Sequence, residues 1–346
     1  MTGATLALLA AVLFGASTPL AKLLLGTIDP WLLAGVFYFA AGLALATSLV
    51  VGRAYGRETR EAPLRRRDLP RLAAVTLFGG LLGPLLLLYG LDLTPASSAS
   101  LLLNLEGLAT MAIAWVVFKE NVDRRILLGA FAILAGAVAL SWPQGPIQPS
   151  WGGLLIAAAC LAWGIDNNLT RTLSSADPVQ IAAVKGLAAG AVNLALAFGR
   201  GAPLPALPEL AGAAIVGVFG YGISLVLFVL ALRQLGTART GAYFSTAPFI
   251  GAVLAIALLG ETIKPELLLA AVLMGIGVAI HLTERHAHEH VHEPLTHEHR
   301  HVHDAHHQHD HDLTDPPGEP HAHPHRHERF QHRHTHYPDL HHRHDH

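Results

Sequence analysis

The sequence has very little charge and almost no cysteine. Cys160 is the one cysteine among 346 residues, and charged residues make up 14% of the chain against 52% hydrophobic residues. A single thiol excludes an intramolecular disulfide and any site built from several thiolates, such as a zinc finger or an iron–sulfur cluster. No G-x-x-x-x-G-K-[ST] loop occurs, which excludes ATP hydrolysis through a P-loop. We expect no enzymatic activity.

Histidine is missing from residues 1–280, and all 24 histidines follow from His281 onward. Residues 1–280 hold 17 basic and 13 acidic residues (net +4), and residues 281–346 hold 6 and 12 (net −6), which together give the net charge of −2. Neither part has the basic stripe that a nucleic-acid-binding protein needs. The chain therefore joins two chemically different parts, neither of which binds nucleic acid.

Ten apolar stretches fill the first part, and most reach about 20 residues, the length that crosses a hydrocarbon core of about 30 Å. A large soluble all-α protein would not need several such runs in series. A secretory signal peptide is disfavoured for the first run because no basic segment precedes Thr5 and Lys22 interrupts the run. The sequence predicts an all-α integral membrane protein with ten transmembrane helices. The stretches are 4–26, 31–52, 70–90, 95–118, 125–142, 151–172, 178–199, 209–232, 236–259 and 266–283.

The basic residues between these stretches predict the orientation, since cytoplasmic loops are enriched in Lys and Arg. With the N-terminus inside, the outer loops hold only Arg200 and Lys264. An even number of spans then places both termini in the cytoplasm. The inner loops hold Arg53, Arg57, Arg60, Arg65, Arg66, Arg67, Arg71, Lys119, Arg124, Arg125, Arg171 and Arg233.

Self-comparison of the sequence indicates an internal repeat. At an offset of about 141 residues Gly79 matches Gly220, and at about 148 Asp29-Pro30 matches Asp177-Pro178. Because a unit of five spans is odd, its second copy must cross the membrane in the opposite sense, and such inverted repeats are typical of transporters. Channels and membrane enzymes stay open as alternatives. The predicted units are residues 1–142, 150–283 and a tail, 284–346.

Several segments also resemble a known family. They are residues 13–22 (LFGASTPLAK), residues 99–106 (ASLLLNLE), Phe118-Lys119-Glu120 and Gly260-Glu261. Residues 4–283 resemble EamA-type carriers of the drug/metabolite transporter superfamily. The resemblance implies ten helices in two five-helix halves, with a solute cavity between the halves. It also implies export of small solutes across the inner membrane of a bacterium, and the histidine tail is no part of this pattern.

Glu106, near the middle of the fourth span, is the strongest candidate for a transport site. An unpaired carboxylate at this depth is costly, so it is usually retained for function. We expect it to couple transport to a proton or to bind solute, with Asn104 supplying an amide nearby. The alternative is a protonated Glu106 that bonds a neighbouring helix for structure.

Three further charged residues lie inside spans. Lys185 is near mid-depth and is expected to pair with a carboxylate, and Asp166, beside Asn167 and Asn168, either lines the inner mouth or caps its helix. Lys22 lies near the outer end of its span, where it either joins the cavity or extends to the headgroups. We include Lys185, Asp166 and Lys22 with Glu106 and Asn104 as candidate cavity residues.

Other polar residues near the span ends favour structural roles. Tyr89, Tyr221 and Tyr243 are expected to be interfacial anchors rather than solute contacts. Glu120 and Glu261 each follow an apolar run beside a turn, so we expect them to fix loop structure.

The tail alternates histidine with other residues, and in an extended segment every second side chain lies on the same side. Its prolines and scarce aliphatic residues predict disorder without metal. Imidazole clusters suit Zn, Ni, Co or Cu, so we expect the tail to bind a divalent transition metal, and we expect transport to require no cofactor. An expression tag and a pH-responsive tail are the alternatives. The expected ligands are His286, His288, His290, His292, His297, His299, His301, His303, His307, His309, His311, His321, His323, His325, His327, His332, His334 and His336.

Together these features predict a bacterial inner-membrane exporter of a small solute. One version exports Ni²⁺, Co²⁺ or Zn²⁺ captured by the tail. Another exports an amino acid or other organic metabolite, with the tail as metal buffer or regulator. A third reading is a membrane-anchored metal storage or sensor protein. The expected partners are the solute or metal ion and the lipid bilayer, and a homodimer is left open.

The loop charges lead to a topology prediction. A reporter fused after Thr283 should be cytoplasmic, because an even number of spans returns the chain to the side of its N-terminus. Paired alkaline phosphatase and fluorescent protein fusions would measure this. A periplasmic signal would contradict either the count of spans or the inverted repeat.

Overall fold

The computed structural model describes residues 2–55, 64–118, 124–141, 150–173 and 176–282, and four short segments of the tail. Its body consists of helices joined by short connections in these ranges. The first repeat contains α1 (Gly3–Leu25), α2 (Pro30–Ala54), η1 (Arg66–Asp68), α3 (Leu69–Val75), η2 (Thr76–Leu82), α4 (Gly83–Asp92), α5 (Ala96–Leu102), α6 (Leu105–Phe118) and α7 (Arg124–Ser141). The second contains α8 (Trp151–Arg171), α9 (Pro178–Gly199), α10 (Leu207–Val216), η3 (Gly217–Ile223), α11 (Ser224–Phe244), α12 (Ala247–Leu259) and α13 (Pro265–Leu282).

The repeated Asp-Pro pair begins the same helix in each repeat. The Asp29 carboxylate accepts hydrogen bonds from the backbone N–H groups at the start of α2, and Asp177 does the same at the start of α9. The following Pro30 and Pro178 occupy the first helical position, where a missing N–H costs nothing. The Asp-Pro pair that repeats in the sequence therefore marks an equivalent helix start in each half of the protein.

The surface of the body suits a lipid environment. Large apolar side chains such as Leu43, Val116, Phe131, Phe219 and Val272 are exposed, and a soluble monomer rarely exposes so much apolar surface. Six described helices are long and apolar enough to cross a membrane, and three shorter apolar helices accompany them. The chain is a multi-pass membrane protein, and the count of ten spans stays a prediction.

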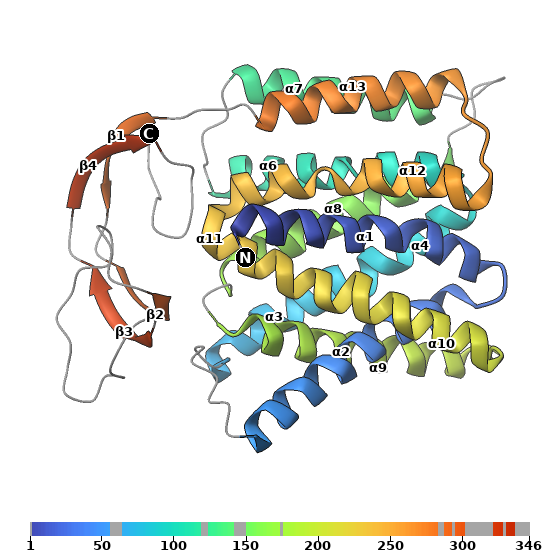
Figure 1. Cartoon of the computed structure of the whole chain (residues 1–346), viewed down its shortest axis with the longest axis horizontal. Helices are drawn as coiled ribbons and strands as arrows, with labels where there is room; N and C mark the ends of the chain where they lie inside the picture. The colour runs from blue at the N-terminus through green and yellow to red at the C-terminus, as the bar shows by residue number, and fades with distance from the viewer. Residues whose placement is uncertain are drawn as a thin grey trace.

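The helices pack in a pseudo-symmetric way (Figure 1). Helices at the same place in the two repeats contact each other, α2 with α9 and α7 with α13. Other contacts occur in matched pairs: α6 with α8 corresponds to α12 with α1, and α9 with η2 corresponds to α2 with η3. This exchange of partners is what two inverted repeats produce.

The contact between α2 and α9 depends on glycine. A Cβ on Gly186 would lie 2.8 Å from the Cα of Gly42, and a Cβ on Gly42 would overlap the backbone of α9. Small residues let membrane helices approach this closely, so the two repeats are joined at their backbones here.

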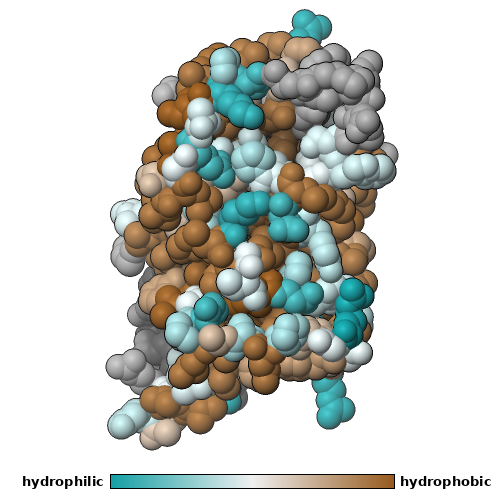
Figure 2. Space-filling view, turned by 90° about the vertical axis from the view of Figure 1, so that its right-hand side faces the viewer, coloured by the Kyte–Doolittle hydropathy of each residue, from teal (hydrophilic) through white to brown (hydrophobic). Residues whose placement is uncertain are grey.

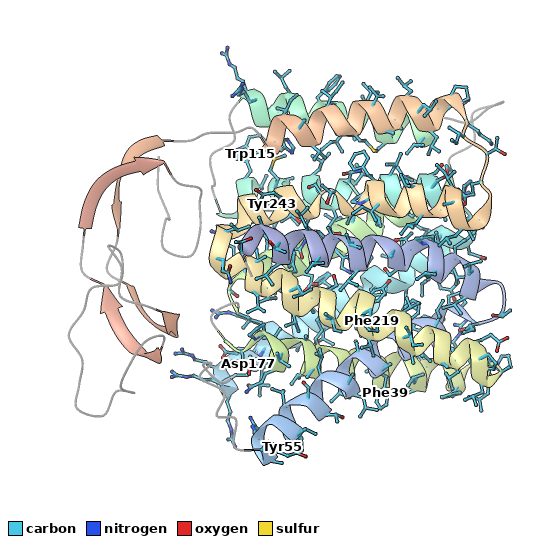
Figure 3. The ribbon with its side chains drawn as sticks, viewed as in Figure 1. Phe39, Tyr55, Trp115, Asp177, Phe219 and Tyr243 are labelled. Atoms are coloured by element: carbon cyan, nitrogen blue, oxygen red, sulfur yellow. The ribbon has the colours of Figure 1, made fainter. Side chains whose placement is uncertain are left out.

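Helices alternate in direction, so their ends fall into two groups. Figure 3 shows Tyr55, after the end of α2, and Asp177, before the start of α9, at the left-hand end of the body. The opposite end is seen in Figure 2, where hydrophilic residues gather mostly along the middle and hydrophobic residues make up most of the flanks. This end therefore carries a band of hydrophilic residues between apolar flanks.

Two spans contain a π-helical segment that the sequence did not predict. They are η2 in the stretch 70–90 and η3 in the stretch 209–232, and they lie 141 residues apart. Inserted π turns inside α-helices are frequent at functional sites. The two halves therefore share this π-helical irregularity of the backbone as well as their helices.

The stretches 95–118 and 236–259 are also interrupted, at Leu103–Asn104 and at Ser245–Thr246. Around the first break the backbone makes i→i−3 bonds, from Leu103 N to Ser100 O and from Asn104 N to Leu101 O. Broken helices near mid-membrane are a common place for transporter binding sites.

The turn predicted at residues 233–235 is wrong, because α11 runs through it to Phe244. At the matching place in the first repeat, Pro95 precedes α5. Proline lacks an N–H and restricts the residue before it, so helices end near it. Its counterpart is Gly236, which lets the helix continue.

The described parts of the tail form four short strands in two antiparallel pairs, β1 with β4 and β2 with β3. An isolated two-stranded ribbon is marginally stable at best in water, so the predicted disorder without metal stays a prediction. The strands are β1 (Ala287–His292), β2 (Leu295–His301), β3 (His321–His327) and β4 (Phe330–Thr335).

Candidate functional site

Glu106 lies in the first turn of α6, directly after the helix break. Its Oε1 accepts a hydrogen bond of 2.9 Å from Nδ2 of Asn167 on α8. The same Nδ2 donates to the hydroxyl of Thr110 at 3.2 Å, and this hydroxyl donates to the backbone oxygen of Glu106 at 2.9 Å. All three side chains are partly exposed. Within the described residues Glu106 has an amide partner and no cationic partner.

Next to this group lies a fully buried ion pair. Nζ of Lys185 on α9 is 2.5 Å from Oδ2 of Asp166 on α8, and the two side chains are 5% and 7% exposed. The hydroxyl of Thr170 donates to the other carboxylate oxygen at 3.1 Å. The prediction that Lys185 pairs with a carboxylate is confirmed. Because each charge neutralises the other, the pair adds no net charge to the site.

The ion pair packs on the π-helical segment η2. A Cβ on Gly79 would overlap the carboxylate of Asp166 and lie 2.6 Å from Nζ of Lys185. Glycine at this position is therefore what lets α8 and α9 bring their charges together against η2.

The carbonyls of η2 are held by side chains from three helices. The Gly79 carbonyl accepts from the Tyr38 hydroxyl at 2.6 Å and from Nε1 of Trp163 at 3.2 Å, and the Gly80 carbonyl accepts from Asn193 at 3.1 Å. The carbonyls lie one helical turn before Pro84, which lacks the backbone N–H that would otherwise bond to one of them. In a membrane such groups must find partners inside the protein, and these side chains provide them.

Aromatic side chains surround the other side of the site. The ring of Phe14 on α1 lies 5.9 Å from Trp163, 6.1 Å from Tyr221 and 5.4 Å from Phe244. Tyr221 also stacks on Phe37 at 5.2 Å. Centroid distances in this range are favourable for aromatic pairs, so the rings form one continuous cluster.

The structure brings Glu106, Asp166 and Lys185 together and leaves the other two candidates apart. The Asn104 amide donates to Leu101 O at 2.9 Å and to the Met274 sulfur at 3.7 Å, so it faces α13 rather than Glu106. Asn167 supplies the amide that Asn104 was expected to supply. Position in the span suggested Asn104, but the direction of the side chain could not be read from the sequence.

Lys22 is a residue of α1 whose side chain reaches the C-terminal end of α4. Its ammonium donates to Leu91 O at 2.5 Å and to Asp92 O at 3.0 Å. Carbonyls at a helix C-terminus lack intrahelical partners and favour a cation. Lys22 therefore caps a helix in this structure.

The residues that we expected to be structural fall into two groups. Glu261 accepts from the N–H groups of Ala96 and Ser97 and so caps the start of α5, as predicted for a loop-fixing role. Tyr221 lies in the buried aromatic cluster, so its prediction as an interfacial anchor is wrong. Glu120 lies outside the described residues.

Histidines of the predicted metal site fall partly in the strands and partly outside the described residues. Among the described residues, no group of three or more His, Cys, Asp or Glu is placed to hold a metal ion. The expected ligands outside the described residues are His286, His303, His307, His309, His311 and His336.

Sequence reasoning missed the partners that complete the site: Thr110, Trp163, Tyr38 and Gly79. One signal was available, since Trp163 and Asn167 are four residues apart and share a face of a helix. The Gly79-Gly80 pair ahead of Pro84 was another, but the π segment itself cannot be inferred from spacing.

Comparisons with known proteins agree with this architecture. The profile of the EamA-like transporter family matches residues 1–142 and 150–283. An uncharacterized transporter of Methanothermobacter thermautotrophicus is 30% identical over 78% of this chain and 83% of its own length. A probable terminal-alkyne amino-acid exporter of Streptantibioticus cattleyicolor is 25% identical over 72% and 85%. A solved crystal structure with 22% identity matches with a TM-score of 0.63, covering 82% of this chain and 99% of its own.

The buried ion pair leads to a stability prediction. Asp166→Asn and Lys185→Met alone should each lower the free energy of unfolding by about 3–5 kcal/mol, because each leaves a buried partner uncompensated. The double variant should lose much less than the sum. Thermal unfolding of the purified protein in detergent would measure the cycle, with exposed Asp92→Asn as control. Losses that simply add would contradict a direct pairing.

Proposed function

Because the chain belongs to the EamA-like transporter family, we propose that it is a secondary transporter exporting a small organic solute across a bacterial inner membrane. Both termini would lie in the cytoplasm, as the loop charges favour. Lacking a P-loop, the chain would draw its energy from a gradient. The two inverted repeats would rock against each other around a site near mid-membrane.

The observation that carries this proposal is Glu106. It is a partly exposed carboxylate at a helix break, held by one amide and unpaired with any cation among the described residues. An intramembrane carboxylate of this kind marks a proton or solute pathway. We assign Glu106 the role of coupling carboxylate, with Asn167 and Thr110 orienting it.

The chemistry of the site favours an organic solute over a metal ion. Glu106 and Asn167 offer one accessible carboxylate and one amide, whereas a divalent cation requires several oxygen or imidazole ligands. The second acid, Asp166, is already neutralised by Lys185. An exported amino acid also agrees with the function given to the Streptantibioticus relative.

Export of Ni²⁺, Co²⁺ or Zn²⁺ is the second candidate, and the histidine tail is the observation that favours it. Alternating imidazoles are suitable ligands for these ions. In the first candidate the same tail would buffer metal or regulate the carrier, and in a storage or sensor protein it would be the whole function. In each case we propose that the tail binds divalent transition metal.

The role of Glu106 is tested by its amide variant. Glu106→Gln keeps the shape and the bond to Asn167 but cannot ionise, so the protein should insert normally and lose most of its transport, at least about tenfold. Export from cells or proteoliposomes would be compared with wild type and with Asp92→Asn, over a range of pH. Full, equally pH-dependent transport in Glu106→Gln would make the carboxylate structural.

The tail is tested by truncation after Glu284. The shortened protein should fold and insert, yet no longer bind several equivalents of Zn²⁺ or Ni²⁺ at neutral pH. Binding to the intact chain should weaken near pH 5, because protonated imidazole cannot ligate a metal. Isothermal titration of both forms measures this, and an unchanged stoichiometry would place the metal sites elsewhere. If metal is the cargo, cells carrying the truncated form should keep some metal resistance but need higher cytoplasmic metal for export, because the tail only raises the local metal concentration. Unchanged resistance, with metal still bound by the intact tail, would favour storage or regulation.

A further inference from the structure

The mid-span charged residues Glu106, Asp166 and Lys185 all lie in one of two pseudo-equivalent helix groups. We call α6, α8, α9 and η2 the polar bundle, and α12, α1, α2 and η3 the aromatic bundle; the contacts within them correspond. At the repeat offsets, Glu106 corresponds to Ala247, Asp166 to Ser17 and Lys185 to Phe37. These three mid-span charges therefore have uncharged counterparts in the aromatic bundle, whereas Arg171 at the end of α8 corresponds to Lys22 near the end of α1.

Contacts at glycine support these correspondences. A Cβ on Gly164 of α8 would meet Thr110 of α6 at 2.9 Å, and a Cβ on Gly251 of α12 would meet Gly15 of α1 at 2.8 Å. Gly164 corresponds to Gly15 and Thr110 to Gly251 at the same offsets. The two bundles thus have the same backbone crossing but different side chains.

Exposure separates the side chains that a solute can reach from those that support the site. Lys185 and Asp166 are buried and satisfied by each other. Glu106, Asn167 and Phe14 are partly exposed. Among the side chains of the site, the accessible groups are therefore the carboxylate of Glu106, the amide of Asn167 and the hydroxyl of Thr110 in the polar bundle, and the ring of Phe14 in the aromatic bundle.

The spacing of these groups follows from α8. Asn167 holds Glu106, and Trp163, which packs edge-to-face with Phe14, lies four residues earlier on the same face. At 1.5 Å per residue the two positions are about 6 Å apart along the helix axis. Phe244, 5.4 Å from Phe14, extends the ring surface to the break in the second repeat.

A cation fits the polar end of this arrangement. The described hydrogen bonds of Asn167 use only its Nδ2, which leaves its amide oxygen as an acceptor beside the carboxylate. An ammonium group has three donors and no acceptor, so it could bond both oxygens. An anionic solute would face a carboxylate, and the only cation nearby, Lys185 among the described residues, is already paired.

We propose that the carrier selects a primary ammonium compound with an apolar body, bound with its ammonium at Glu106 and Asn167 and its body against Phe14 and Phe244. Phe14 is then the residue that determines specificity for the body. The proposal rests on the transport function proposed above and adds the class and the orientation of the solute. Such a solute is either a simple amine or an amino acid with an apolar side chain.

The test uses the purified full-length protein and four probes. They are 2-phenylethylamine, L-phenylalanine, 3-phenylpropanoate and ethylamine, with binding measured by isothermal titration and transport measured in proteoliposomes. Phenylethylamine should bind at least about tenfold more tightly than phenylpropanoate, which lacks the ammonium, and than ethylamine, which lacks the ring. Phenylalanine binding as tightly as phenylethylamine would identify amino acids as the source of the ammonium; much weaker binding would identify simple amines.

Two variants separate the head from the body of the solute. Glu106→Gln should remove the preference for phenylethylamine over phenylpropanoate while keeping the preference for a ring. Phe14→Ala should weaken phenylethylamine about tenfold and leave ethylamine unchanged. Phe198→Ala, at an exposed position near the end of α9, is the matched control and should change neither ratio.

The outcomes distinguish the inference from the proposed function. If phenylpropanoate binds as well as phenylethylamine, or Phe14→Ala weakens all four probes equally, the assigned orientation is wrong. A second outcome is that none of the four probes binds, but another solute is transported and Glu106→Gln abolishes its transport. The proposed transport function would then be supported, and the proposed solute class would be wrong. If Glu106→Gln transports normally, the coupling role itself falls.

Discussion

The constraint on which this structure depends is that polar groups inside a membrane have no water to bond with. Each backbone carbonyl or charge freed from regular pairing must find a partner inside the protein. At η2 the Gly79 carbonyl finds Tyr38 and Trp163, and Asp166 finds Lys185. The polar network is therefore a consequence of the irregular helix, and it ties α2, α8 and α9 to the same point.

Glu106 is the exception, and in the proposed function it is the residue that acts in transport. The other charges nearby are neutralised. The Glu106 carboxylate, in contrast, accepts a hydrogen bond from the Asn167 amide and lies near the Thr110 hydroxyl, but it pairs with no cation among the described residues. A half-satisfied carboxylate costs stability unless something binds it during the working cycle. In the proposed function the neighbouring ion pair is a fixed support, and Glu106 is the side chain that exchanges its partner.

The sequence predicted the parts of the fold that follow from composition and period. Apolar length indicated the spans, and the Asp-Pro pairs indicated the repeat, whose matched helix starts the structure then showed. Lys185 was expected to pair with a carboxylate, which the structure confirms with Asp166. Side-chain direction and backbone irregularity could not be predicted. Asn104 was chosen for depth but faces Met274, while Asn167 reaches Glu106 only because α8 crosses α6 at Gly164.

An inverted repeat with identical halves would place a second carboxylate opposite Glu106, and a small solute with one ammonium could neutralise only one of them. The other would stay buried without a partner, at a cost of several kcal/mol or more. Replacing the second set by Ala247, Ser17 and Phe37 removes this cost and adds apolar surface. In the proposed transport mechanism the backbone then keeps the symmetry that alternating access needs, while the side chains give the solute one orientation.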